Sequence, residues 1–394
     1  MSGGLYRKAA RLTGVESSPT LRLNALAQEM IRQGKDVMNL TAGETDFETP
    51  AAVCDAAVEA LRKGKTRYTN PHGTPELRSA VAGWFLREFG LRYEREQVTV
   101  TCGVKQGLFH LLLATVGPGD EVIVPAPYWV SYPEMVRLAA GVPVIVPPAE
   151  DFSLDVDAVL AAVGPRTRMV ILNSPSNPTG AVVPEKELER LARGLEGSDV
   201  LVASDEIYNY LVYDGASARP FAAVSPDAAA RTVTFNGLSK SHAMTGWRVG
   251  FAAGPRAVID AMGILQAQSA TNITTFVQDA AVEALRQTRA DFEPRRQDLE
   301  ERRNFCLGLF AAEPRIRMVR PAGAFYLFPD VSQFFGARVG GSEAMAEFLL
   351  ERAGVAVVPG KPFGEDRCIR LSFSKDKSTL EKGILRLIAA MKTL

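Results

Sequence analysis

A lysine and an arginine share a polar loop between two apolar runs of the chain. The first run, Thr232–Phe235, is rich in β-branched residues and precedes Asn236-Gly237, which predicts a buried strand ending in a tight turn. Lys240 and Arg248 follow, and a second apolar run, Val249–Ala253, closes the loop. Open α/β sheets bind ligands beyond the carboxyl ends of their strands. A lysine desolvated there becomes a nucleophile for carbonyl groups, and a fixed guanidinium beside it would bind a phosphate.

Two further stretches contain residues suited to binding anions, although each also has an ordinary structural explanation. Gly103-Val104-Lys105 lies where a predicted strand meets a predicted helix, so free backbone N–H groups and the helix dipole would hold a phosphate. Arg370 lies inside the apolar stretch 368–372, and a buried guanidinium requires a partner. Its planar fork matches a substrate carboxylate, and a structural ion pair is the alternative.

Longer motifs connect these residues to a known family. They are S-K-x5-G-W-R-V-G around Lys240, N-S-P-S-N-P-T-G at 173–180 and S-D-E-I-Y at 204–208. Together, and in this order, they resemble the class I/II aminotransferases, which are pyridoxal-phosphate (PLP) enzymes of fold type I. Within that family, P-Y-W-V-S-Y-P-E-M at 127–135 and A-M-T-G-W-R-V-G at 243–250 are most similar to bacterial aspartate aminotransferases.

The resemblance implies how PLP would be held. Lys240 would carry the cofactor covalently, and Asp205 would keep its pyridine nitrogen protonated, so that the ring withdraws electrons. Tyr208 would contact the ring hydroxyl and, with Lys240 and Asp205, complete the catalytic set. The other implied cofactor contacts are Asn177 at the ring hydroxyl, Trp129 over the ring, Gly103, Val104, Lys105, Ser239 and Arg248 around the phosphate, and Tyr68 reaching in from a neighbouring subunit of a homodimer.

The same resemblance implies the substrate contacts. Arg370 would orient the α-carboxylate of the substrate, with Gly43 close by and with Trp129 and Asn177 also touching the substrate. A dicarboxylate substrate needs a second cation, because burying its distal charge unpaired is costly. Lys105 could supply that cation, or it could add positive charge against the phosphate.

Two departures from the family pattern are visible. Thr45 stands where many relatives have a proline, and this change leaves Gly43 in place. Many relatives also have a hydroxyl residue a few positions before the lysine. Here Gly237-Leu238-Ser239 leaves only Ser239, so the hydroxyl that contacts the phosphate stays open.

The implied reaction is ping-pong transamination from an L-amino acid, aspartate by resemblance, to a 2-oxo acid such as 2-oxoglutarate. Three alternatives stay open. The first is another aminotransferase specificity, namely aromatic, alanine-type or prephenate. The second is a PLP-dependent C–S β-lyase on the same fold. The third is a non-catalytic sensor, against which Lys240 and the lack of an appended DNA-binding segment both argue.

Short, continuously apolar runs alternate with helical patterns from residue 97 to about 280. This rhythm predicts an α/β fold with a mainly parallel sheet covered by helices on both faces. After residue 280 helices and short strands mix, which predicts a smaller α+β unit with strands at 317–319, 324–328, 355–358 and 369–372. By resemblance, residues 48–285 form a large PLP domain with a seven-stranded sheet, and 1–47 with 286–394 form the small domain.

Composition excludes several classes of function. The 394 residues have a formal net charge of zero with scattered basic residues, which argues against a nucleic-acid-binding protein. Four cysteines without C-x-x-C spacing and three histidines argue against a disulfide framework or a metal site. We expect no signal peptide and no membrane segment, because no apolar stretch is long enough, and therefore a cytoplasmic protein.

Overall fold

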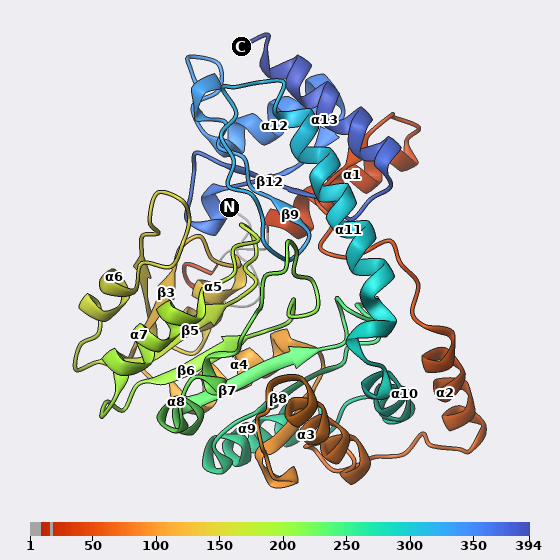
Figure 1. The fold of residues 1–394 in the computed structure, drawn as a ribbon, viewed down its shortest axis with the longest axis vertical. Coiled ribbons are helices and arrows are strands. Elements are labelled where there is room, and N and C mark those ends of the chain that lie inside the picture. The colour runs from red at the N-terminus through yellow and green to blue at the C-terminus, as the bar shows by residue number, and fades with distance from the viewer. Residues whose placement is uncertain (1–8, 16–18) are drawn as a thin grey trace, which may run out of the picture.

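The computed structural model describes residues 9–15 and 19–394, and its largest feature is a seven-stranded sheet (Figure 1). Neighbouring strands are parallel except β8, which runs antiparallel to both β2 and β7. The predicted mostly parallel seven-stranded sheet is therefore confirmed. In spatial order the strands are β2 (Val98–Thr101), β8 (Gly250–Ala253), β7 (Thr232–Gly237), β6 (Leu201–Asp205), β5 (Thr167–Asn173), β3 (Glu121–Pro125) and β4 (Val142–Val146).

The central strands are apolar on both faces, because helices cover both. In β5, Met169 and Ile171 pack in the same cluster as Leu108 and Leu111 of α4 (Val104–Thr115). The alternate residue Val170 joins a second cluster with Leu188 and Leu191 of α7 (Glu185–Leu195). Adjacent residues of a strand point to opposite faces, so this run of apolar residues reflects burial on both sides.

The helices around the sheet begin and end where the local sequence predicts. The start of α3 (Pro75–Phe89) illustrates this, since the Thr74 side chain accepts a hydrogen bond from the Leu77 backbone N–H and Pro75 opens the helix. Gly90 ends α3 in the left-handed conformation. The other helices of this region are α2 (Ala51–Arg62), α5 (Ser131–Leu138), α6 (Val156–Ala161), α8 (Pro226–Arg231), α9 (Arg256–Ser269) and α10 (Thr275–Arg286).

A second group of elements lies at the end of the molecule where the C-terminus is found (Figure 1). Strand β12 (Ile369–Ser372) is the centre of a three-stranded antiparallel sheet with β11 (Val358–Pro359) and β9 (Tyr326–Leu327). Strand β1 (Met38–Asn39) pairs in parallel with β10 (Val355–Ala356), so a segment from the start of the chain joins the C-terminal elements. The helices here are α1 (Pro19–Arg32), α11 (Arg289–Phe310), α12 (Ser342–Ala353) and α13 (Lys377–Met391).

Two details of the C-terminal part differ from the sequence-based expectation. The predicted strand 317–319 is only an isolated bridge between Arg317 and Asp330. Arg317 is exposed and the next two residues are half-buried, and Pro321 soon follows without a backbone donor, so a longer ladder does not form. The predicted strand 355–358 is two short strands, β10 and β11, because the chain leaves one small sheet and enters another.

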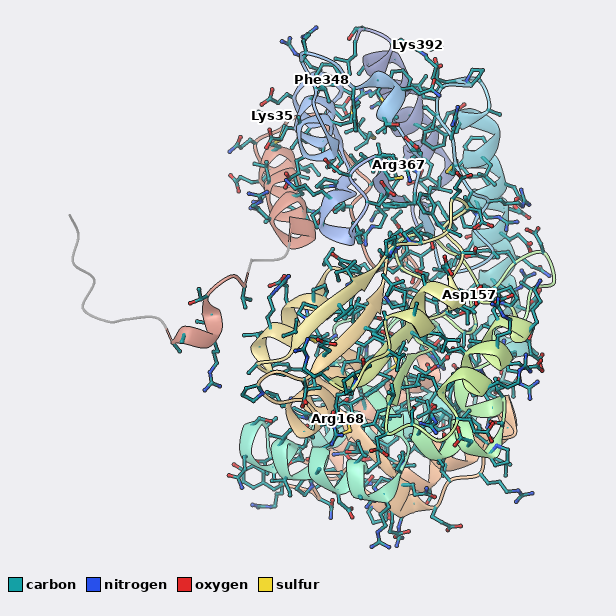
Figure 2. The ribbon with its side chains drawn as sticks, turned by 90° about the vertical axis from the view of Figure 1, so that its left-hand side faces the viewer. Lys35, Asp157, Arg168, Phe348, Arg367 and Lys392 are labelled. Carbon is teal, nitrogen blue, oxygen red and sulfur yellow. The ribbon has the colours of Figure 1, made fainter. Side chains whose placement is uncertain are left out.

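The surface carries dispersed charge. Exposed side chains such as Lys35, Asp157 and Arg168 point outward from different elements (Figure 2). Within residues 9–15 and 19–394, no helix combines the length and apolar character needed to cross a membrane. All four cysteines are free thiols.

Candidate active site

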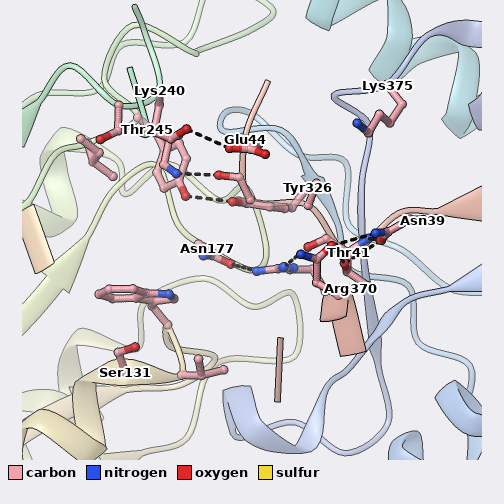
Figure 3. Close-up of a pocket in the computed structure, with 18 of the residues that line it drawn as sticks. Asn39, Thr41, Glu44, Ser131, Asn177, Lys240, Thr245, Tyr326, Arg370 and Lys375 are labelled. Carbon is pink, nitrogen blue, oxygen red and sulfur yellow. Dashed lines mark hydrogen bonds between the residues drawn. The ribbon is translucent and has the colours of Figure 1, made fainter. Parts of the chain in front are cut away.

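A pocket of about 730 Å³ lies at the carboxyl ends of β5, β6 and β7, where the two groups of elements meet (Figure 3). It collects residues that are distant in sequence, as the ligand position of an open α/β sheet requires. The sequence-predicted residues that line it are Gly43, Val104, Lys105, Trp129, Asn177, Asp205, Tyr208, Ser239, Lys240, Arg248 and Arg370.

Lys240 extends into this pocket from the loop after β7. Its Nζ donates a hydrogen bond to the Gly43 carbonyl oxygen at 2.6 Å. Burial lowers the pKa of Lys240 to about 8, although the nearby Glu44 carboxylate opposes that shift. At pH 7 about one tenth of the amine is therefore neutral and nucleophilic, far more than for an ordinary lysine.

One end of the pocket is built to receive an anion. Gly103 precedes α4 with φ +77°, and a Cβ there would lie 2.5 Å from a guanidinium nitrogen of Arg248. Gly250 allows β8 to lie against the start of α4, since a Cβ on Gly250 would lie 2.3 Å from the Val104 nitrogen. The start of α4 carries the positive end of the helix dipole, and the missing side chains of these two glycines let Arg248 and β8 lie directly against it. A phosphate fits this cradle.

Arg248 completes the cradle from an unusual backbone conformation. Its φ of 59° lies in the left-handed region, which costs energy for a residue with a side chain. Its two Nη atoms donate to the carbonyl oxygens of Thr245 at 2.9 Å and Cys102 at 3.2 Å, and among the described side chains no carboxylate pairs with it. These two hydrogen bonds already orient the guanidinium.

Asp205 is the last residue of β6 and is almost fully buried. Tyr132 Oη donates to Asp205 Oδ2 at 2.7 Å, and the Ile207 backbone N–H donates to Oδ1 at 3.3 Å. Burial raises the pKa of Asp205 to about 6, against the effect of the Tyr132 hydrogen bond. A buried carboxylate in this state favours a cationic partner such as a protonated pyridine nitrogen.

Arg370, on β12, is 2% exposed and has no acidic partner among the described residues. Its Nη1 donates to Asn177 Oδ1 and its Nη2 to the Thr41 carbonyl oxygen, both at 2.9 Å, while Nε has no partner. The guanidinium lies 4.4 Å from the ring centroid of Tyr326 and 5.1 Å from that of Phe363. The structural ion pair considered from the sequence is absent, which leaves a buried cation in need of a carboxylate.

The remaining predicted residues are distributed around this frame. Lys105 Nζ lies 5.1 Å from the centroid of the Trp129 ring, and partial burial lowers the pKa of Lys105. Tyr208 is buried, and burial raises the pKa of its phenol well above the usual value. Tyr68 differs from all of these, because it is 87% exposed and lies outside the pocket of its own chain. Its reach into a neighbouring subunit stays a prediction.

Several lining residues were not identified from the sequence. Tyr326 lies on β9, and its Oη is 3.0 Å from Tyr208 Oη. Glu44 accepts a hydrogen bond from Thr245 Oγ1 at 2.8 Å, and Lys375 lines the outer part of the pocket. The sequence did contain a signal for Tyr326, because 324–328 and 369–372 were both predicted as strands of the same small unit. The position of Tyr132 beneath Asp205 depends on a contact 73 residues apart, which no local pattern reveals.

Comparison with known proteins identifies the family. The model of aminotransferase class I and II matches residues 35–387. The chain belongs to this family. It is 47% identical over 382 residues to an aspartate/prephenate aminotransferase of Thermus thermophilus, and the match covers 95% of this chain and 96% of that protein. It is also 42% identical to an aspartate aminotransferase of Geobacillus stearothermophilus, over 96% of this chain and 97% of that protein.

Solved structures give the same result for the fold of this aminotransferase. The aspartate aminotransferase of Thermus thermophilus with maleate superposes with a TM-score of 0.93 at 44% identity, covering 98% of this chain and all of that one. The chain is therefore an enzyme with the fold type I architecture. The pocket that contains Lys240 is its candidate active site.

Proposed function

We propose that this aminotransferase transfers the amino group of an L-amino acid, with aspartate as the preferred donor, to a 2-oxo acid such as 2-oxoglutarate, using PLP. One observation carries the proposal. A lysine whose pKa is lowered to about 8 shares one pocket with a buried carboxylate, Asp205, and a buried, unpaired guanidinium, Arg370. The relatives named for aspartate support the choice of donor.

The donor set of the pocket fits PLP. The anion cradle of Gly103, Val104 and Arg248 would hold the phosphate, with Ser239 as the nearby hydroxyl and Lys105 adjacent. Asp205 would pair with the pyridine nitrogen, Asn177 and Tyr208 would face the ring hydroxyl, and Trp129 would cover the ring. When bound, PLP supplies an electron-withdrawing ring that acidifies the Cα–H bond of an attached amino acid.

The side chains of this chain would then bind the substrate and move its proton. Arg370 would bind the α-carboxylate through its fork, using the Nε that has no partner in the free site. Gly43 leaves room beside it, since only the Tyr326 hydroxyl approaches the position of a Cβ there, at 3.4 Å. Lys240, with a pKa of about 8, suits both removal of the Cα proton and its return at a neighbouring carbon.

Lys105 is the proposed cation for the distal carboxylate of a dicarboxylate substrate, with support of the phosphate as the alternative. It also borders a second cavity, of about 440 Å³, which shares Val130 and Ser131 with the main pocket. That adjoining space favours prephenate, a larger dicarboxylate, as a second amino-group acceptor. The Thermus thermophilus relative is named for both substrates.

Three further features belong to the proposal. The enzyme works as a homodimer in which Tyr68 of each subunit reaches the PLP phosphate of the other, consistent with its exposed position. Residues 48–285 form the large domain, and 1–47 with 286–394 form the small one. Residues 1–8 and 16–18 lie outside the described part of the chain. The enzyme is cytoplasmic.

A single-turnover experiment tests the reaction. PLP-loaded enzyme mixed with ¹⁵N-aspartate and no acceptor should release one equivalent of oxaloacetate per site and keep the ¹⁵N label. Addition of 2-oxoglutarate should then release labelled glutamate. A parallel mixture with a cysteine thioether in place of aspartate tests the β-lyase alternative, which would break the Cβ–S bond and release a thiol, pyruvate and free ammonia. No reaction with any amino acid would refute the proposal. Replacing 2-oxoglutarate with prephenate in the second step tests whether prephenate is a second amino-group acceptor.

A further inference from the structure

Tyr326 occupies a position between the two ends of the pocket. It is 1% exposed, and its strand β9 pairs with β12, the strand that carries Arg370. The chain just before it is fixed to the large sheet region, because the Ala322 and Gly323 backbone N–H groups both donate to the Gly180 carbonyl oxygen. The Tyr326 side chain is therefore held in place by both groups of elements.

Within the described part of the chain, the hydroxyl of Tyr326 has one hydrogen-bond partner, the hydroxyl of Tyr208, at 3.0 Å. Only one of the two phenols can donate in this bond. If Tyr326 donates, the proton of Tyr208 is free to point into the pocket, and a phenol that accepts a hydrogen bond is a better donor. Burial raises the pKa of both phenols, and more strongly that of Tyr208, while Arg370 opposes both shifts. The Arg370 guanidinium lies against the Tyr326 ring, so Tyr326 is the more acidic phenol and the better donor in this bond.

The ring of Tyr326 serves the other end of the site. Its centroid lies 4.4 Å from Arg370 Cζ, and Phe363 lies at 5.1 Å. No described carboxylate pairs with Arg370, so the negative faces of these rings and two neutral oxygens stabilise the buried cation until a substrate carboxylate arrives. Figure 3 shows Tyr326 between Lys240 and Arg370.

We infer that Tyr326 is a positioning residue for both ends of the pocket: its hydroxyl directs the Tyr208 proton toward the cofactor ring, and its ring holds Arg370 for the substrate carboxylate. This inference rests on the proposed function, because it assumes that PLP and an α-carboxylate occupy the pocket. It assigns separate tasks to two parts of one side chain, so two substitutions can separate them.

The first test uses Tyr326→Phe, which removes the hydroxyl and keeps the ring. The absorbance of the PLP-loaded enzyme is titrated against pH. The titratable or charged groups around the Tyr208 phenol are Tyr326, Arg370, Asp205 and Tyr132. In this variant Tyr208 becomes a weaker donor to the anionic ring oxygen of PLP. The pH midpoint of the absorbance change should therefore rise by on the order of half a pH unit. Tyr93→Phe, which removes a phenol hydroxyl outside the pocket, is the matched control and should leave the midpoint unchanged.

The second test measures the affinity of the PLP-loaded enzyme for succinate, a dicarboxylate that cannot react. Tyr326→Phe should bind it within about threefold of the wild type, whereas Tyr326→Leu should bind it about 10- to 30-fold more weakly. An unchanged midpoint in Tyr326→Phe, or wild-type succinate affinity in Tyr326→Leu, would overturn the inference. A wild-type enzyme that shows no PLP absorbance would instead refute the proposed function itself.

Discussion

Two buried arginines, Arg370 in the pocket and Arg303 on α11, have different surroundings. Arg303 is 0% exposed, and its Nη atoms donate to both carboxylate oxygens of Asp214 at 2.8 Å. Arg370 is 2% exposed and contacts only neutral oxygens and aromatic rings among the described residues. The same side chain is thus a paired structural cation at one site and an unpaired cation at the other.

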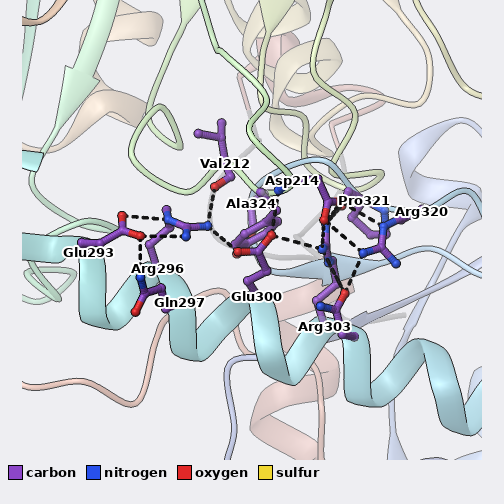
Figure 4. A network of polar contacts seen from close by, with 12 residues as sticks. Val212, Asp214, Glu293, Arg296, Gln297, Glu300, Arg303, Arg320, Pro321 and Ala324 are labelled. Atoms are coloured by element: carbon purple, nitrogen blue, oxygen red, sulfur yellow. Dashed lines mark hydrogen bonds and ion pairs between the residues drawn. The ribbon is translucent and has the colours of Figure 1, made fainter.

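The surroundings of Arg303 form a continuous polar network along α11 (Figure 4). Asp214 also accepts hydrogen bonds from Arg320, and Arg303 donates to the Pro321 carbonyl oxygen at 2.8 Å. Glu300 bridges to Arg296 at 2.7 Å. The network joins α11 to two loops of the chain, one of which leads into β9 and the pocket. Its charges pair with one another, and Arg303 is the fully buried member.

The pocket has the opposite organisation. Three charged groups of the pocket are desolvated. Burial raises the pKa of Asp205 and lowers the pKa values of Lys240 and Arg370, so it disfavours the charged form of each. Such charges destabilise the empty protein and are stabilised when a ligand of opposite charge binds. Pairing therefore separates the two roles of buried charge. Paired groups contribute to stability, and unpaired groups contribute to binding and catalysis.

Removal of the pocket lysine should have the largest effect. Lys240→Ala should lower transamination by roughly 10²–10⁴-fold or more, because both proton transfer and covalent attachment of PLP are lost. Its melting temperature without PLP should equal or exceed that of the wild type, since a desolvated amine is removed. Steady-state assays and thermal denaturation of the two proteins measure this. A strongly destabilised Lys240→Ala protein would contradict the assignment of Lys240 to function.

Arg370→Leu should have the second-largest effect on activity. Two charge-assisted hydrogen bonds to the α-carboxylate, each contributing about 1.5–3 kcal/mol, are lost. Capture of amino and 2-oxo acids should weaken by roughly 10²-fold or more, measured as kcat/KM for both substrate classes. Stability should change little, because an unpaired charge is replaced by an apolar side chain. An effect confined to acidic substrates would make Arg370 the anchor of the distal carboxylate instead.

Asp214→Asn should show the reverse profile, with activity kept and stability lost. Asp214 is about half exposed, so screening limits the loss to about 1–2 kcal/mol, or a few degrees in melting temperature. Hydrogen bonds from Arg320 and Arg303 hold the pKa of Asp214 well below its usual range. The stability that Asp214 contributes is therefore complete at pH 7 and decreases as the pH falls below about 4.

The control for Asp214→Asn is Asp157→Asn. Asp157 pairs with Arg190 on the surface, where its side chain is 82% exposed, so its loss should have almost no effect on the melting temperature. Equal losses for the two variants, or a difference that does not shrink at low pH, would mean that the α11 network does not act through the pairing of Asp214.

Lys105→Ser should have the smallest effect. It should lower kcat/KM for aspartate and glutamate about tenfold and spare apolar or aromatic amino acids, because only the dicarboxylates lose a charged contact. Parallel assays with aspartate and an aromatic donor measure the ratio. Equal losses for both classes would show that Lys105 serves the phosphate. The choice of aspartate would then rest on similarity to the relatives.

The sequence predicted the parts of this account that local patterns encode. The strands around Lys240 and the loop that carries Asn177 were identified because each motif is contiguous and ends a buried apolar run. Tyr326 and the pairing of Arg303 with Asp214 were not, because each depends on contacts between residues about 90 or more positions apart. The sequence also left open whether Arg370 has an acidic partner. The folded structure answers this, because neutral oxygens and the Tyr326 ring surround the guanidinium.

The most direct test of the central claim is to locate the cofactor on the chain. The enzyme is loaded with PLP, reduced with borohydride, digested and mapped by mass spectrometry. The account predicts a single pyridoxyl label on Lys240, the unpaired lysine beside Asp205 and Arg370. A label on Lys105, Lys375 or any other lysine would contradict it.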